Sequence, residues 1–519
     1  MRSLFTQAPV PRDLALPAPA LAAAARAPRP GGVRQDFDSG VDGRLLEVFD
    51  RAKDPEDAFE LRDLWLGRVE HQLAGRGGRP WLADRWTSSP RLRATTADEV
   101  LSGPGTVRFV KELFNWYFRD DLYGELRPSA HRILSGGAVD EVAWGLPASL
   151  KDCVAFALDR DWYGYSDSRG RLPSREAVAE YENVRIAGSP YTSANVALTM
   201  GGTVGISSLA DFVLHGRAGA SPALVAAPNY PPLVEAIARR RPVRLVPLAS
   251  ESGQTSLEPL LAQLRPDTPM VMMQTVGNPT GALVREDDLV KLVRAAAPST
   301  TIVLDECHEW LGPVERASAE RAAANVVRVS SLSKNWSAPG LKVGWLLADS
   351  RFVDEYYEYA STSIGGPPSF FYTLVEVLAR MERWRLLGVV EPDAGHLAEF
   401  EAGYGLTAEG LRTAYAGYAA EREARERGLI GLRHAAVARL SEMPVRVVPP
   451  RFSVNLAVEF PQWDDSYACF RDLLDETGVS LLPGILTFCL SGAVMRVTPA
   501  QRWDHLDDAL GRLSARMGS

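Results

Sequence analysis

Three side chains that could do chemistry follow shortly after short apolar runs of the sequence. They are the carboxylate of Asp305, the amine of Lys334 and the amide of Asn278. A lysine amine can form a covalent bond with a carbonyl group, and it can also move a proton as a general base. The chain has only six lysines, because its basic residues are nearly all arginine. A site that needs a reactive lysine therefore has few candidates.

The apolar runs predict the elements that position these side chains. Runs of about five apolar residues separated by segments of helical pattern are typical of buried parallel strands joined by helices. The predicted strands are 223–227, 270–274, 301–305 and 326–330, and the predicted helices include 231–240 and 286–297. We therefore expect a mostly parallel central sheet flanked by helices, an α/β fold. In such sheets ligands bind beyond the carboxyl ends of the strands, where the three side chains fall.

A glycine-rich segment and two serines offer a site for an anion. Residues 199–205 contain Gly202, Thr203 and Val204 and precede a helical run at 206–215. Backbone N–H groups at a helix N-terminus bind phosphate. Hydroxyl groups at Ser331 and Ser333, beside Lys334, add further donors.

The rest of the chain predicts four successive regions. Residues 1–42 are rich in Ala, Pro and Arg and predict a disordered leader, and residues 43–132 predict a helical N-terminal extension. Residues 133–370 would form the large domain together with the first part of a smaller one. Residues 371–519, with strand-like runs at 453–460 and 493–498, would form a smaller α+β domain.

Composition narrows the function classes. The net charge of -8 argues against nucleic acid or an anionic membrane as a partner and favours a small soluble substrate. Four cysteines without metal-ligand spacing predict neither a disulfide framework nor a metal site, which fits the cytoplasm. No uncharged apolar run reaches the roughly 18 residues needed to cross a bilayer.

Taken together, these motifs resemble the class I/II aminotransferases, which are fold-type I enzymes that use pyridoxal 5'-phosphate (PLP). The resemblance spans about residues 134–514, and it rests on motifs in a fixed order. They are Asn278-Pro-Thr-Gly281, Asp305, Ser331-Leu-Ser-Lys334 and Pro339-Gly-Leu-Lys-Val-Gly344. The last two also look similar to 1-aminocyclopropane-1-carboxylate synthases.

The resemblance implies roles around the cofactor ring. Lys334 would carry PLP as an internal aldimine and act as the base in the external aldimine and quinonoid states. Asp305 would keep the pyridine nitrogen protonated, and Asn278 would approach the phenolic oxygen and the substrate. Tyr230 would stack on the ring. Arg496 would bind the substrate carboxylate in a fork of two hydrogen bonds, near Gly137.

The phosphate group and the oligomer follow from the same resemblance. Gly202, Thr203, Val204, Ser331 and Ser333 match phosphate-binding positions. Tyr165 matches a tyrosine that reaches the phosphate from a neighbouring subunit. This match implies a homodimer with shared active sites, although a packed loop tyrosine is the alternative.

Three departures from the family pattern affect the predicted reaction. Lys342 stands where most relatives carry a phosphate-binding arginine, so it offers a point charge instead of a fork. His308 stands where relatives usually carry a tyrosine near the phenolic oxygen, and it could also act as an acid or base near neutral pH. Residues 362–371 contain no arginine for a side-chain carboxylate, so dicarboxylate substrates are not supported.

Three functions remain open on the sequence alone. The first is a PLP-dependent aminotransferase acting on an α-amino acid. The second is a lyase, replacement or C–C bond-forming enzyme that eliminates at Cβ or Cγ, for example on S-adenosylmethionine, in specialised biosynthesis. The third, a transcriptional regulator with an aminotransferase-like sensor, is disfavoured because the chain is acidic overall and residues 43–132 show no recognition-helix pattern.

Overall fold

A seven-stranded sheet forms the centre of the computed structural model, which describes residues 3–5, 12–74, 76–216, 219, 221–363 and 366–518. All neighbouring strands run parallel except β12, which is antiparallel to both of its neighbours. The strand order is β3 (Val196–Thr199), β12 (Gly344–Leu347), β11 (Val326–Ser331), β10 (Thr301–Asp305), β8 (Met270–Gln274), β4 (Ala223–Ala227) and β5 (Val243–Pro247). The prediction of a mostly parallel sheet is confirmed, and the four predicted strands form as expected.

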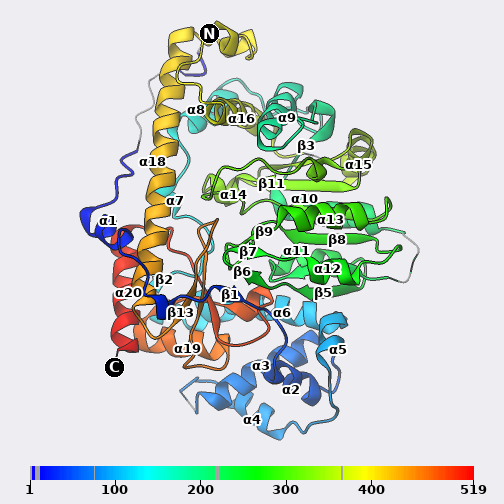
Figure 1. Ribbon diagram of the computed structural model, residues 1–519, viewed down its shortest axis with the longest axis vertical. Coiled ribbons are helices and arrows are strands. Elements are labelled where there is room, and N and C mark those ends of the chain that lie inside the picture. Colours follow the sequence, from blue (N-terminus) through cyan, green and yellow to red (C-terminus); the bar gives the residue numbers. More distant parts are fainter. Residues whose placement is uncertain are drawn as a thin grey trace.

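Helices cover both faces of this sheet, which explains why most side chains of its strands are apolar (Figure 1). Successive side chains of a strand point to opposite faces. In β10, Val303 belongs to one hydrophobic cluster, whereas Ile302 and Leu304 belong to another with Leu289 and Leu292 of α13. The helices that flank the sheet are α10 (Gly201–Leu214), α11 (Pro231–Ala238), α12 (Glu258–Gln263), α13 (Glu286–Ala295) and α15 (Ser350–Ser363).

A second sheet lies toward the C-terminus. Its four strands are antiparallel in the order β13 (Arg446–Val448), β14 (Leu456–Glu459), β17 (Val494–Val497) and β16 (Leu482–Pro483). The helices α19 (Ser466–Thr477) and α20 (Trp503–Met517) pack beside it. Before it runs α18 (Ala408–Ser441), a helix of 34 residues that spans much of the molecule (Figure 1). We call this four-stranded sheet the C-terminal sheet.

A short strand pairing ties the segment before the central sheet to the C-terminal part. β2 (Arg132–Ile133) pairs in parallel with β15 (Val479–Ser480). Besides the helices that flank the central sheet, the α-helices between β2 and α18 are α7 (Glu141–Trp144), α8 (Ala148–Asp159), α9 (Leu172–Arg185), α14 (Leu332–Asn335), α16 (Tyr372–Leu386) and α17 (Ala394–Leu397).

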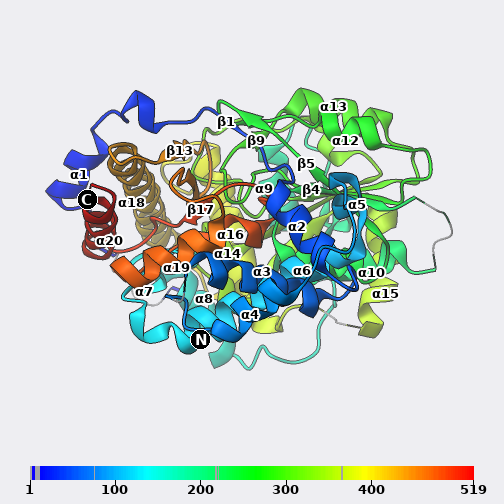
Figure 2. The ribbon, with the colours of Figure 1, turned by 90° about the horizontal axis from the view of Figure 1, so that it is seen from below.

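The N-terminal extension, residues 43–132, is helical as predicted. Side chains cap its helices, since Asp42 and Asp57 accept backbone N–H bonds and Thr96 forms a capping box with Glu99. Its elements are α2 (Gly43–Arg51), α3 (Ala58–Gln72), α4 (Pro80–Ser88), α5 (Ala97–Ser102), α6 (Pro104–Trp116) and the π-helical segment η2 (Tyr117–Glu125). Figure 2 shows the extension lying against α19 on one side and against the central sheet's helices on the other.

The leader differs from the sequence expectation of disorder over residues 12–42. Helix α1 (Ala18–Ala24) packs along α18 with Ala20 and Ala23 buried, because small side chains permit a close approach. Its two prolines lie at the start of the helix, where no backbone donor is needed. Strand β1 (Asp36–Phe37) then pairs with β6 (Ser250–Glu251) in a small sheet with β7 (Gln254–Thr255) and β9 (Leu283–Val284). Residues 1, 2 and 6–11 of the predicted leader lie outside the described part.

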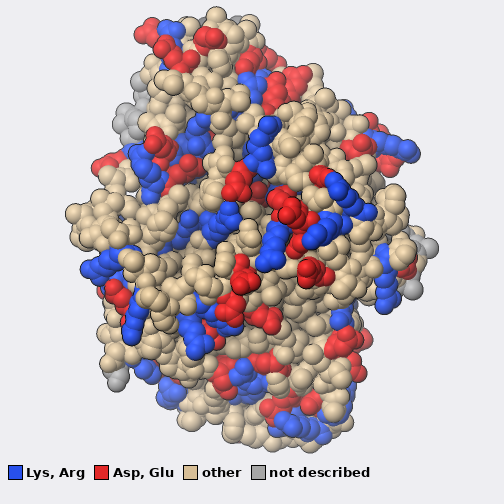
Figure 3. Space-filling view, viewed as in Figure 1, with Lys and Arg blue, Asp and Glu red and all other residues tan. Residues whose placement is uncertain are grey.

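Acidic and basic side chains are interspersed over the face shown in Figure 3, without a broad patch of one sign. Within the described ranges, none of the helices is both long enough and apolar enough to cross a membrane.

Candidate active site

Lys334 lies in α14, directly after the carboxyl end of β11. Its Nζ atom donates a hydrogen bond to the carbonyl oxygen of Gly137 at 2.6 Å. Burial, and then the positive charge of Arg496, lower the pKa of the Lys334 amine to about 8. A measurable fraction of the amine is therefore neutral and nucleophilic near neutral pH.

Asp305 ends β10, the neighbouring strand, and is buried. Its Oδ2 accepts a hydrogen bond from Gln274 Nε2 at 2.9 Å, and its Oδ1 accepts one from the backbone N–H of Cys307 at 3.1 Å. Gln274 is the residue paired with Asp305 across β8 and β10. The pairing of β8 with β10 therefore places Gln274 where it orients the Asp305 carboxylate. The sequence motifs did not reveal this role of Gln274.

Arg496 projects from β17 of the C-terminal sheet into the same place. Its guanidinium donates to the backbone oxygen of Ser135 at 2.8 Å and to Asn278 Oδ1 at 3.2 Å. Burial lowers the pKa of Arg496 to about 10, so the group stays protonated at neutral pH. Gly137 has a φ of +62°, and a Cβ atom there would lie 2.5 Å from Arg496 Nη2. A side chain at position 137 would therefore displace the guanidinium.

His308 is buried beside Lys334 and Arg496, so its pKa differs from that of an exposed histidine. Its Nδ1 is 2.9 Å from Ser453 Oγ. Burial, followed by the charges of Lys334 and Arg496, lowers the pKa of His308 well below its ordinary value. The imidazole is therefore neutral at pH 7, and the sequence-based idea that it titrates near neutrality does not fit these surroundings.

Donors for an anion gather at one end of the cavity. Helix α10 begins at Gly201, and a Cβ atom at Gly202 would lie 2.9 Å from Cys307 Sγ. Ser331 caps α14 and donates to Cys307 Sγ at 3.2 Å. Thr203, Ser333 and Lys342 line the same cavity, which thus offers hydroxyls, a helix N-terminus and a cation to one anionic group.

The cavity that holds these groups has a volume of about 380 Å³. Twelve of the fourteen sequence-predicted site residues line it: Gly137, Gly202, Thr203, Tyr230, Asn278, Asp305, His308, Ser331, Ser333, Lys334, Lys342 and Arg496. Val204, in the first turn of α10, does not line the cavity. Tyr165 is fully exposed and borders a separate surface hollow with Trp162 and Ser369.

Two aromatic side chains of the N-terminal extension, Phe114 and Phe118, also line the cavity. The sequence predicted this segment only as a helical extension and assigned it no residue of the site. Only their position relative to Tyr230 in three dimensions brings them to the site.

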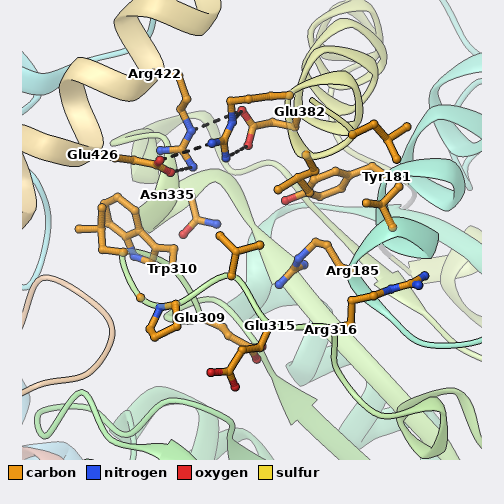
Figure 4. Close-up of a pocket in the computed structure, with 18 of the residues that line it drawn as sticks. Tyr181, Arg185, Glu309, Trp310, Glu315, Arg316, Asn335, Glu382, Arg422 and Glu426 are labelled. Carbon is orange, nitrogen blue, oxygen red and sulfur yellow. Dashed lines mark hydrogen bonds and ion pairs between the residues drawn. The ribbon is translucent and has the colours of Figure 1, made fainter. Parts of the chain in front are cut away.

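A larger cavity of about 510 Å³ lies on the other side of the segments that carry His308 and Lys334 (Figure 4). Glu309 and Asn335, the next residues along the chain, face it together with charged groups of α16 and α18. Arg422 is paired there with Glu382 and Glu426. Since no lysine lines this cavity among the described residues, the smaller cavity is the candidate active site.

The fold and the site together define a class. A mostly parallel sheet with a lysine, a carboxylate and a buried arginine at its carboxyl edge is the arrangement of fold-type I PLP enzymes. A family model described as aminotransferase class I and II matches residues 145–513 of the chain. The chain belongs to this family.

Known relatives are distant in sequence. An aspartate aminotransferase of Pyrococcus horikoshii is 25% identical over 256 residues, which cover 48% of this chain and 64% of the relative. A probable aminotransferase of Arabidopsis thaliana is 26% identical over 269 residues, covering 48% and 63%. The chain thus aligns with slightly less than two thirds of these two relatives. An aromatic-amino-acid aminotransferase of Thermococcus litoralis is 22% identical over 75% of this chain and 92% of the relative.

Solved structures show the same fold. A double mutant of Thermus thermophilus aspartate aminotransferase superposes with a TM-score of 0.61 at 19% identity, covering 82% of this chain and 99% of that one. An aromatic aminotransferase of Pyrococcus horikoshii has a TM-score of 0.60 at 18% identity, with 76% and 98% covered.

The cofactor of the family is PLP, and the residues present fit it. The missing Cβ at Gly202 leaves room beside Cys307, and hydroxyl and N–H donors suited to a phosphate gather there. Lys334 offers an amine to the aldehyde, and Asp305 offers a fixed carboxylate to the pyridine nitrogen.

Proposed function

We propose that the protein is a PLP-dependent aminotransferase that acts on an α-amino acid through Lys334. The observation that carries the proposal is the meeting of Lys334, Asp305 and Arg496 in one cavity, with the pKa of the lysine lowered to about 8. An amine, a carboxylate and a guanidinium are the three groups that cofactor attachment, ring protonation and carboxylate binding require.

PLP, when bound, accepts the electron pair released at the substrate α-carbon. Asp305 holds the proton on the ring nitrogen, and Gln274 keeps the carboxylate oriented. Tyr230, which is half-buried, offers its ring face to the pyridine ring. Lys334 attaches the cofactor and afterwards moves the proton at the substrate α-carbon.

The substrate carboxylate binds Arg496. Its two terminal nitrogens are oriented by Ser135 and Asn278, so that a carboxylate meets a preset guanidinium. Gly137 brings backbone close to both Arg496 and Lys334. These contacts determine which bond of the α-carbon faces the ring.

Four side-chain or backbone groups bind the phosphate in this proposal: Gly202, Thr203, Ser331 and Lys342. Ser333 and Val204 support the loop and the helix that carry them. Neutral His308, held by Ser453, would lie beside the bound cofactor and could offer it a hydrogen bond.

A homodimer with shared active sites is part of the proposal. The exposed position of Tyr165 supports it, because a relative side-chain exposure of 110% leaves the ring free to enter a neighbouring subunit. Mixing Lys334→Ala and Tyr165→Ala subunits should regenerate one intact site per heterodimer, or about a quarter of the wild-type activity after random exchange. Lack of any recovery in a proven heterodimer would contradict the shared site.

We also propose the division into a large domain at 133–370, which includes the first part of the smaller one, and a small domain at 371–519, which contains α18. A cytoplasmic location is supported by the four cysteines, all free and buried.

Product analysis tests the reaction. Transamination converts the bound cofactor to pyridoxamine phosphate, which absorbs in the near ultraviolet, and releases a 2-oxo acid. An eliminating enzyme would return the cofactor to its yellow form and release an unsaturated or cleaved product, which would replace this proposal with the lyase alternative.

Borohydride reduction tests the attachment point. The reduced wild type should carry the cofactor on the peptide that contains Lys334, and Lys334→Ala should carry none. Lys291→Ala is the matched control, because Lys291 lies on the exposed side of α13 and pairs with Asp288. Covalent cofactor retained by Lys334→Ala would overturn the proposal.

A further inference from the structure

The N-terminal extension forms part of the cavity wall although it lies outside the matched family region, which begins at residue 145. Helix α6 packs against α11, the helix that starts directly after Tyr230, and against the turn η9 (Gly484–Thr487) of the C-terminal part. At the end of α6 the chain presents Phe114 and Phe118 to the cavity that holds Lys334 and Arg496.

These two rings form an apolar wall next to the cofactor ring position. Phe114 meets Tyr230 edge to face, with ring centroids 5.8 Å apart, and Phe118 meets Phe114 at 4.9 Å. Leu233 of α11 lines the same side. Both phenylalanines are only half-buried by the protein itself. Their remaining apolar surface faces the cavity, so a substrate side chain could cover it.

The wall is held in place by the residue between the two phenylalanines along the helix. The hydroxyl of Tyr117 donates to the backbone oxygen of Leu481 at 3.1 Å and lies 2.9 Å from Ser480 Oγ. Leu482, the next residue, pairs with Arg496 across β16 and β17. The wall is therefore anchored to the segment that leads into β16, the strand paired with the one that carries the arginine.

A π-helical segment makes this anchoring possible. Such segments are rare and are frequently found at functional sites. In η2, Asp121 is buried and accepts a hydrogen bond from Tyr467 at 2.7 Å, and its other oxygen pairs with Arg79 at 2.6 Å. These contacts join the segment to α19 and to the start of α4.

Few charged groups line the cavity, and Lys111, whose Nζ lies 5.8 Å from the centre of the Phe114 ring, is not one of them. Among the described residues that line the cavity, the Asp, His, Lys and Arg side chains are those of Asp305, His308, Lys334, Lys342 and Arg496. Each of them already has a place around the cofactor or the substrate carboxylate. A charged substrate side chain against the phenylalanines would lose its hydration without gaining a partner.

We propose that Phe114 and Phe118 of the N-terminal extension bind the substrate side chain, and that the substrates are α-amino acids with apolar or aromatic side chains. This inference rests on the proposed function, and it assigns the extension a role in specificity. The rings act by contact area, because burial of an apolar side chain of leucine or phenylalanine size strengthens binding by roughly ten- to a hundredfold.

Calorimetric titration of the PLP-loaded protein with amino acids tests the proposal without measuring turnover. The panel contains alanine, leucine, phenylalanine, aspartate and lysine. The wild type should bind leucine and phenylalanine about tenfold or more tightly than alanine, and aspartate and lysine most weakly. Phe118→Ala should weaken binding of phenylalanine about tenfold and of alanine less than twofold.

Two further variants keep the test decisive. Phe118→Leu preserves an apolar side chain for the fold and should still weaken the binding of phenylalanine more than the binding of alanine. Phe59→Ala is the matched control, since Phe59 lies in the same extension on α3 with 58% of its surface exposed and does not line the cavity. Its dissociation constants should equal those of the wild type.

The outcomes separate this inference from the proposed function. If no α-amino acid binds the wild type or alters the absorbance of its cofactor, the proposed function fails. If amino acids bind but aspartate or lysine binds most tightly, the inference alone fails. It also fails if Phe118→Ala weakens alanine and phenylalanine equally, because the ring would then support the fold and not the side-chain pocket.

Discussion

The lowered pKa of Lys334 makes a quantitative prediction about how the apoprotein takes up its cofactor. Only the neutral amine condenses with the aldehyde of PLP, so the rate of covalent incorporation should rise with pH and level off above the pKa. With a pKa of about 8, roughly a tenth of the amine is neutral at pH 7. An ordinary lysine with a pKa near 10.5 would be neutral in only about 0.03% of molecules, roughly 300-fold less.

Arg496 is the perturbation that tests the cause. Lys334 donates to the carbonyl of Gly137, and the Arg496 guanidinium lies against the α-carbon side of the same residue. The guanidinium of Arg496 disfavours the charged form of the Lys334 amine, so removing it should raise the pKa of Lys334 by about one unit. Arg496→Gln should therefore incorporate PLP about tenfold more slowly at pH 7 and equally fast above pH 10. Burial, the larger cause, remains and keeps the pKa below that of a free lysine.

The assay follows the growth of visible absorbance after PLP is mixed with apoprotein. It is repeated from about pH 6 to about pH 11, a range that covers the pKa of Lys334 and that of an ordinary lysine. PLP titrates too, so each rate is divided by the rate with acetyl-lysine amide under the same conditions. A wild-type midpoint near that of free lysine would refute the argument from burial. An unchanged midpoint in Arg496→Gln would refute the argument from charge.

Three further predictions follow from buried contacts. Glu306→Gln should lower the free energy of unfolding in urea by about 3 kcal/mol, because Arg321 and Arg328 lose the carboxylate between them, at 2.7 to 2.9 Å. Gly137→Ala should leave cofactor absorbance intact but weaken amino acid binding at least about tenfold, since its Cβ would displace Arg496. Three cysteines that do not line the cavity, Cys153, Cys469 and Cys489, should react with a thiol reagent only after unfolding, because burial raises their pKa and blocks access.

Matched controls accompany two of these predictions. Glu355→Gln breaks an exposed pair with Arg351 and should change stability by less than about 0.5 kcal/mol. Gly136→Ala adds a Cβ that meets no atom within 4 Å; because Gly136 also lines the cavity, this change should weaken amino acid binding, but less than Gly137→Ala does. A loss at position 136 equal to that at 137 would show that the loop, not the contact with Arg496, determines binding.

The sequence predicted much of the central sheet because local patterns determine it. The strands at 270–274 and 301–305 are apolar except at Thr301 and at their last residues, Gln274 and Asp305, as expected for strands buried on both faces. Lys334 and Asp305 were predicted because their positions at strand ends follow from the same pattern. Gln274 was missed, since only the register between β8 and β10 brings it to Asp305.

Phe114 and Phe118 were missed for a different physical reason. Aromatic residues at helical spacing fit a packed core and a cavity wall equally well. Which of these they form depends on whether neighbouring segments in three dimensions cover the rings fully or only in part. The leader was misread because alanine-rich sequence has little hydrophobicity, yet α1 is stabilised by close packing on α18.

The attachment of Tyr117 to Leu481 and Ser480 has a consequence for how the protein could be re-engineered. It places the side-chain pocket on a stretch of chain, residues 104–125, that is separate in sequence from every group that handles the cofactor. Exchanging residues 114 and 118 while keeping Tyr117 would alter substrate preference as an independent module. Directed evolution of new specificity can therefore begin in residues 104–125, which precede the region matched by the aminotransferase family model.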